Sequence, residues 1–153
     1  MSLRTLIEKK YKEAIKSKNL DKANTLRLIK SAIKNKDIEK RTADSKEGIE
    51  DQKIIILLQN LIKQRKDSIE FFKVASRDDL IIVEKLEIDV IGQFLPQQLN
   101  KQEIEEMIRG IVSRKNFSSL KDMGALMNII KTEHAGSVDM TIAGKIAKLL
   151  FSK

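Results

Sequence analysis

The stretch IGQFLPQQLN, residues 91–100, divides the chain because it contains Pro96, the only proline among the 153 residues. Proline lacks a backbone donor and clashes with the preceding helical turn, so a helix that reaches it must end. Four of the six glycines follow Pro96, and the charge there is sparser than before it. We therefore predict two modules, residues 1–96 and 97–153, which meet at a hinge formed by Pro96.

Composition favours helices throughout the chain. Leu, Ile, Lys, Glu and Ala dominate, and the alternation typical of strands is absent. We predict an all-α protein in which an N-terminal helical bundle with a long helical hairpin precedes a C-terminal three-helix domain. Cysteine is absent, which excludes a disulfide scaffold and fits a reducing, cytoplasmic compartment. The longest apolar run, 54–58, is too short to cross a bilayer, and we expect neither a membrane contact nor a secretory signal.

Apolar residues at helical spacing predict the first helices of the N-terminal module. The first helix covers 3–17, and the second runs from a cap at Asp21 to about Lys40. Asp44 and Glu47 have the spacing of a capping box, which predicts the start of a long third helix.

A break at 76–78 separates the long helix from a fourth helix that ends at Pro96. Asp78 or Asp79 is predicted to cap this helix. The link is short, so the third and fourth helices should form an antiparallel hairpin. The residues predicted to face inward on the fourth helix are Leu80, Val83, Leu86, Val90, Ile91 and Phe94.

The C-terminal module carries clear start and stop signals for three short helices. The predicted starts are the pairs Asn100/Glu103 and Ser119/Asp122, and Asp139. The predicted stops are Asn116, in a left-handed conformation, and Gly136, as the first residue after a helix cap. The last helix is expected to turn Ile142, Ile146, Leu149 and Leu150 inward.

Gly124 and Gly144 lie inside predicted helices, where glycine costs about 1 kcal/mol relative to alanine. Close approach of two helices within the bundle explains them, and this is the interpretation we favour. Close approach of a ligand backbone to the helix is the alternative.

Several strings resemble the GatB/YqeY domain family and its stand-alone YqeY-like members. In the C-terminal module these strings are FLPQQLNKQEIEEMI (94–108), LKDMGALMNIIK (120–131) and HAGSVDMTIAGKIAKLL (134–150). In the N-terminal module, ANTLRLIKSAIKNKDIEKR (23–41) and the segment 61–96 are similar to the helices of YqeY-like proteins. The resemblance thus covers nearly the whole chain.

This resemblance implies a two-part, all-α protein connected with transfer RNA. In the family, the same tail ends the B subunit of the tRNA-dependent amidotransferase, where it contacts the tRNA body while other domains perform the chemistry. Related modules are attached to some glutaminyl-tRNA synthetases. The resemblance therefore implies tRNA or another structured RNA as a partner, together with the amidation or synthetase machinery. It also implies an association with carbon–nitrogen ligase activity that uses glutamine as amide donor.

The residues themselves supply no recognisable catalytic or cofactor-binding set. His134 is the only histidine and is predicted to cap a helix C-terminus, where a partial positive charge is favourable. The chain has no zinc-protease, EF-hand or Cys/His motif, so we assign no metal, no cofactor and no catalytic residue. We expect no intrinsic enzymatic activity.

Positive charge is concentrated at the start of the chain. Residues 1–46 hold 14 Lys/Arg against 6 Asp/Glu, a net +8, whereas 47–96 carry −3 and 97–153 carry +3. Without an aromatic ladder for base stacking, such a surface suits phosphate contacts to folded RNA. The predicted RNA-binding residues are Lys30, Lys34, Arg41, Lys63, Lys66, Lys121, Lys131, Lys145 and Lys148. For each of them, an ordinary solvated side chain is the alternative.

Three functions follow from these observations. The first is an accessory protein that binds tRNA and has no active site. The second is a protein–protein adaptor or self-associating bundle, because the middle segment is acidic and its helices have long apolar faces. The third is a glutamine-dependent amidotransferase, which we rank last because no Cys or Ser nucleophile has a Lys or His partner in a recognisable setting.

Overall fold

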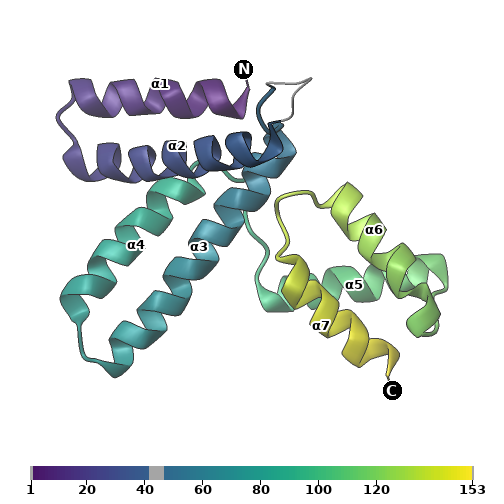
Figure 1. Ribbon diagram of the computed structural model, residues 1–153. Helices are drawn as coiled ribbons and strands as arrows, with labels where there is room; N and C mark the ends of the chain where they lie inside the picture. Colours follow the sequence, from purple (N-terminus) through teal and green to yellow (C-terminus); the bar gives the residue numbers. More distant parts are fainter. Residues whose placement is uncertain (1, 42–46, 153) are drawn as a thin grey trace. The chain divides into compact units, whose positions relative to one another are not determined.

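The computed structural model describes residues 2–41 and 47–152 (Figure 1). These residues form seven α-helices and one short 3-10 helix and contain no strand, which confirms the predicted all-α class. The chain divides into two compact units, Met1–Leu95 and Pro96–Lys153. Pro96 is the first residue of the second unit, and its role as a hinge stays a prediction.

The first unit contains four helices that pack in two pairs. They are α1 (Leu3–Lys16), α2 (Leu20–Lys40), α3 (Asp51–Val74) and α4 (Asp78–Gly92). Helices α1 and α2 lie side by side, and α3 and α4 form the predicted long hairpin (Figure 1). Helices α2 and α3 each contact all three of the other helices of the unit, so the two together form its centre.

The core of the first unit lies where these helices meet. Leu26 and Ile29 of α2 are fully buried, as are Ile54 and Leu58 of α3. Ile91, near the end of α4, is also fully buried. Burial of such a side chain contributes about 1.5–3 kcal/mol, so this cluster supplies much of the stability of the unit.

Two predicted helix starts in the first unit are wrong. Helix α2 is capped by Asn19, whose side chain accepts a hydrogen bond from the Lys22 amide at 3.2 Å, and Asp21 instead lies in the first turn. Helix α4 follows Arg77, which places both Asp78 and Asp79 in its first turn. Acidic residues in a first turn still stabilise the helix by interaction with its dipole.

The start of α3 also differs from the prediction. This helix begins at Asp51 and is preceded by Glu50, which makes no side-chain capping bond. Asp44, the predicted cap, lies outside the described residues.

Helix α4 carries two apolar faces, and only one of them is covered. Ile81 and Ile91 are buried, whereas Val83 and Leu86 are 48% and 49% exposed. The prediction that Val83 and Leu86 face inward is therefore wrong. The hairpin with α3 uses the face of Ile81 and Ile91, because one helix can turn only one face toward its partner.

The second unit is a three-helix domain with a short 3-10 turn. Its elements are α5 (Lys101–Lys115), η1 (Leu120–Asp122), α6 (Met123–Glu133) and α7 (Met140–Phe151). Ile104, Ile108, Leu126 and Ile130 are fully buried and form its core. Leu149 was predicted to face this core, but it is 65% exposed; α7 packs on the core through Ala143 and Ala147 and through the other predicted residues, Ile142, Ile146 and Leu150.

The local signals for this unit are mostly confirmed. Asn100 and Glu103 form a capping box, with the side chain of each accepting a bond from the backbone amide of the other. Asp139 caps α7, and Asn116 is left-handed with φ 58°. Gly136 is left-handed at φ 78°, but it lies one position further from the helix end than predicted.

The pair Ser119/Asp122 also marks a helix start, that of η1, which leads directly into α6. The Asp122 carboxylate accepts bonds from the backbone amides of Ser118 and Ser119, at 2.8 and 3.3 Å. The hydrogen bond from Ser118 is the main reason that the pKa of Asp122 is lowered. The negative charge is thus held at a helix N-terminus, where the dipole favours it.

A clamp between Arg4 and Asp37 joins α1, α2 and the segment that leads into α3. The Arg4 guanidinium contacts both Asp37 carboxylate oxygens, at 2.7 and 3.0 Å, and also donates to the Ile49 carbonyl. Asp37 in turn accepts a bond from the Ile49 amide at 2.8 Å. A Cβ atom on Gly48 would lie only 2.6 Å from Arg4 Nη2 and 2.7 Å from Asp37 Oδ1, so a larger residue there would displace the two side chains of the clamp.

The clamp predicts a pH-dependent stability. The hydrogen bond from Arg4 lowers the pKa of Asp37, so its contribution is present at neutral pH and is lost as the pH falls through the lowered value. Asp37→Asn should reduce the free energy of unfolding of the first unit by about 1–2 kcal/mol at pH 7. The difference from wild type should shrink toward pH 3. Urea unfolding followed by NMR signals of residues 2–41 measures both quantities.

The matched control is Glu39→Gln, which removes an exposed carboxylate two residues away whose ion pair among residues 2–41 and 47–152 is with Lys36. This substitution should change the free energy of unfolding of the first unit at pH 7 by less than about 0.5 kcal/mol. A loss for Asp37→Asn that is the same at pH 3 as at pH 7 would show that the ionised carboxylate is not the source of the stability.

Candidate nucleic-acid interface

A groove of about 500 Å³ between α1 and α2 is lined by four cationic side chains. These are Arg4, Arg27, Lys30 and Lys34. Glu8 and Asp37 also line it, and each pairs with one of the cations: Lys30 Nζ lies 2.8 Å from Glu8, and Arg4 is held by Asp37. Two of the four cations are thus neutralised and positioned by acids, which leaves the positive charge of Arg27 and Lys34 in excess.

Tyr11 of α1 orders two cations beside this groove. The ammonium group of Lys30 lies 4.2 Å from the centroid of the Tyr11 ring, and the guanidinium carbon of Arg27 lies 5.8 Å from it. Arg27 also donates a hydrogen bond to the Tyr11 hydroxyl at 3.2 Å. Cation–π contacts of this kind are worth about 0.5–1 kcal/mol at exposed sites, so they position the side chains without neutralising them.

The structure brings together only part of the predicted RNA-binding set in this unit. Lys30 and Lys34 line the same groove, one helical turn apart on α2. Arg41 follows the end of α2 and is exposed. Lys63 and Lys66 are exposed on α3 and do not line the groove.

Arg4 and Arg27 line the groove but were not predicted. Arg27 was detectable in the sequence, because positions 27, 30 and 34 are three and four residues apart and share a helix face. Arg4 lies on another helix, and no local pattern connects it with this face.

The predicted cations of the second unit are exposed and scattered over three elements. Lys121 lies on η1, Lys131 in the last turn of α6, and Lys145 and Lys148 on α7. Lys145 and Lys148 are three residues apart and therefore share one face of α7.

A separate groove of about 400 Å³ between α5 and α7 is lined by two other cations, Lys101 and Arg109, which were not among the predicted RNA-binding residues. Arg109 contacts Glu105 at 3.0 Å. Ile146 and Leu149 of α7 also line this groove. The groove of the second unit therefore has fewer cations than the groove between α1 and α2, and apolar side chains lie among them.

Neither unit presents a recognisable catalytic or metal centre within the described residues. No group of three or more His, Asp or Glu side chains among residues 2–41 and 47–152 is arranged to hold a metal ion. His134 is half-buried at the C-cap of α6, where its amide bonds to the Ile130 carbonyl at 2.9 Å. None of the described helices is long and apolar enough to span a bilayer.

Comparison with known proteins places the chain in a family. The profile of the family described as Yqey-like protein matches residues 4–150, nearly the full length. The chain belongs to the Yqey-like protein family. The family assignment agrees with the resemblance seen in both modules.

Individual Yqey-like relatives add little about activity. An uncharacterized protein of Schizosaccharomyces pombe, C22F3.15, is 35% identical over 96 residues, which are 63% of this chain and 74% of the relative. "Altered inheritance of mitochondria protein 41, mitochondrial" is 34% identical in Saccharomyces cerevisiae (strain YJM789) over 93 residues, and 36% identical in Lachancea thermotolerans over 91 residues. These matches cover 61% and 60% of this chain, and 48% and 46% of the two relatives. The chain thus spans about half the length of these mitochondrial relatives.

Gly124 and Gly144 do not mark close helix packing, which corrects the interpretation that we favoured. A Cβ atom on Gly124 would meet no described atom within 4 Å, and one on Gly144 would meet only the end of Met127, at an ordinary 3.8 Å. The helices of this unit meet through larger side chains and through alanines on α7. Approach of a ligand to these positions is the remaining interpretation.

This geometry predicts that alanine is tolerated at both positions. Gly124→Ala and Gly144→Ala should each raise the free energy of unfolding of the second unit by about 0.5–1 kcal/mol, because alanine favours the helix and finds room. Gly136→Ala is the contrasting variant and should lower it by roughly 1–2 kcal/mol, since Gly136 is left-handed. Urea unfolding monitored by NMR signals of residues 97–152 provides the measurement. Destabilisation by Gly124→Ala would restore the packing interpretation.

Proposed function

We propose that this Yqey-like protein is an accessory RNA-binding protein that holds a folded RNA of the tRNA class through phosphate contacts. The groove between α1 and α2 carries the proposal, since it gathers Arg4, Arg27, Lys30 and Lys34 within the segment of highest net charge. Arginine and lysine side chains at such spacing suit a row of phosphates. The cations of α7 and of the α5–α7 groove would add further phosphate contacts from the second unit.

The mode of recognition follows from the composition of the groove. Aromatic residues make up 4% of the chain, and the single tyrosine is engaged by Arg27 and Lys30. An unstacked base therefore has no free aromatic ring to stack on at this groove. Recognition through the shape and the backbone of a double-helical RNA segment is the mode that such a surface supports.

The proposed link to aminoacyl-tRNA amidation is supported by the resemblance of the C-terminal unit to the tail of the amidotransferase B subunit. In this proposal the chain contributes RNA binding, and a partner enzyme performs the transfer of the glutamine amide. A cytoplasmic location remains a prediction, and the relatives from two yeasts are described as mitochondrial.

Filter binding with unmodified tRNA over a series of salt concentrations tests the proposal. The affinity should fall steeply as salt rises, because bound phosphates release counterions. Lys34→Ala should weaken binding at every salt concentration and lower the salt slope by about 1, the signature of one lost phosphate contact. Among the described residues, Lys34 has no acidic partner, so its removal leaves no unpaired charge behind.

The matched control is Lys85→Ala, which removes the same charge from an exposed position on the acidic helix α4. It should leave the salt slope unchanged. Absence of tRNA binding at low salt, or an equal effect of the two variants, would refute the α1–α2 groove as the site. A glutaminase assay of the purified chain completes the test, and clear turnover would contradict the assignment of the chemistry to a partner enzyme.

A further inference from the structure

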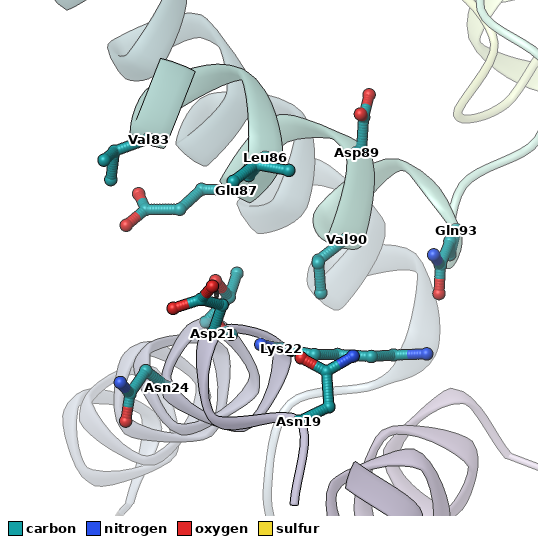
Figure 2. A pocket seen from close by; sticks show the side chains of 11 residues that line it. Asn19, Asp21, Lys22, Asn24, Val83, Leu86, Glu87, Asp89, Val90 and Gln93 are labelled. Carbon is teal, nitrogen blue, oxygen red and sulfur yellow. Dashed lines mark hydrogen bonds between the residues drawn. The ribbon is translucent and has the colours of Figure 1, made fainter. Parts of the chain in front are cut away.

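A second groove of the first unit, about 520 Å³ in volume, lies between the start of α2 and the C-terminal half of α4 (Figure 2). Its α4 side carries Val83, Leu86 and Val90, which follow each other at spacings of three and four residues. Asn19, Lys22 and Thr25 of the opposite wall come from α2 and its cap. All of these residues belong to the first unit.

The apolar side of this groove is covered only at Val90, which packs partly against the core of the unit. Val83 and Leu86 are about half exposed, although the sequence pattern marks them as core residues. They form the second apolar face of α4, since α3 already occupies the face of Ile81 and Ile91. A row of apolar residues at spacings of three and four is the pattern that one helix presents to another.

The charge around the groove is mainly negative. Helix α4 has five acids and one lysine, a net charge of −4. The groove is lined by Asp21, Glu87 and Asp89 together with Lys22. In Figure 2 the carboxylates of Asp21, on α2, and Glu87, on α4, lie toward the same end of the groove, at the left of the view.

Glu87 is bonded to Arg65 at 2.7 Å, so the remaining charges of the groove are those of Asp21 and Asp89 against that of Lys22, a net charge of −1. Nearby Glu84 has a raised pKa because it is partly buried and, secondarily, because Glu87 is close. Added positive charge would therefore be favourable here, and a polyanion such as RNA would be repelled.

We propose that this groove receives an amphipathic helix of a partner protein, with apolar residues every three or four positions and lysine or arginine along its flanks. The apolar residues of the partner would pack on Val83, Leu86 and Val90, and its basic residues would face Asp21 and Asp89. The site is distinct from the basic α1–α2 groove and independent of RNA binding. It gives the protein a means to join RNA to a basic protein partner.

A designed 18-residue peptide of leucine and lysine, with leucine at helical spacing, is the probe. The reference peptide has each lysine replaced by glutamate. Binding to the full chain is measured by fluorescence anisotropy, and the site is mapped by NMR amide shifts. The basic peptide should shift amides at the start of α2 and along 83–93, and the acidic peptide should bind at least tenfold more weakly.

Two variants test the two parts of the site. Leu86→Gln keeps a good helix former and should raise the Kd of the basic peptide about tenfold, as for a central apolar contact. Asp89→Lys should raise it about threefold to fivefold, and it is tolerated because lysine near a helix C-terminus is favourable. The matched controls are Phe71→Gln, an apolar residue that is 71% exposed and outside the groove, and Glu106→Lys in the second unit. Both should change the Kd less than twofold.

Several outcomes would overturn the proposal. Amide shifts confined to other helices, equal binding of the two peptides, or equal effects of the variants and their controls would each exclude this groove as the peptide site. A dimer of the free chain that Leu86→Gln converts to a monomer would identify a second copy as the occupant instead. Loss of tRNA binding on Leu86→Gln, with unchanged peptide binding, would assign the groove to RNA.

Discussion

The mutual packing of α2 and α3, each of which also contacts α1 and α4, is the constraint on which the first unit depends. Leu26 and Ile29 of α2 are fully buried in the same core cluster as Ile54 and Leu58 of α3, so a substitution that changes the volume of any of them disturbs a close-packed core. The same geometry determines where the cations lie. Positions 27, 30 and 34 fall on the side of α2 that borders α1, and this places basic side chains around a groove rather than over an open surface.

Signals that involve residues three or four apart were predictable, because their chemistry is completed within one helical turn. The capping box of Asn100 and Glu103 is an example, and the left-handed Asn116 depends on a single residue type. Asp21 and Asp78 were misassigned as caps because an acid stabilises a helix both as a cap and in the first turn, and composition alone does not separate the two positions. The all-α class followed from the composition together with the helical spacing of the apolar residues.

Features that depend on distant pairs were beyond the reach of the sequence. Arg4 and Asp37 are separated by 33 positions, and nothing local indicates that they meet. The choice between the two apolar faces of α4 is likewise made by α3, since both faces have helical spacing. The candidate RNA surface shows both situations: Arg27 shares a pattern with Lys30, whereas Arg4 joins the groove only because α1 folds back on α2.

The unequal distribution of charge in the first unit has a consequence for encounter rates. Residues 1–46, the part of the sequence that contains α1 and α2, carry +8, whereas 47–96 carry −3, and α4 begins with two aspartates at the far end of the α3–α4 hairpin (Figure 1). The unit therefore has a permanent electric dipole moment. In the electric field of a polyanion the unit experiences a torque that turns α1 and α2 toward the polyanion before contact. A larger fraction of encounters then begins in the binding orientation, which raises the association rate.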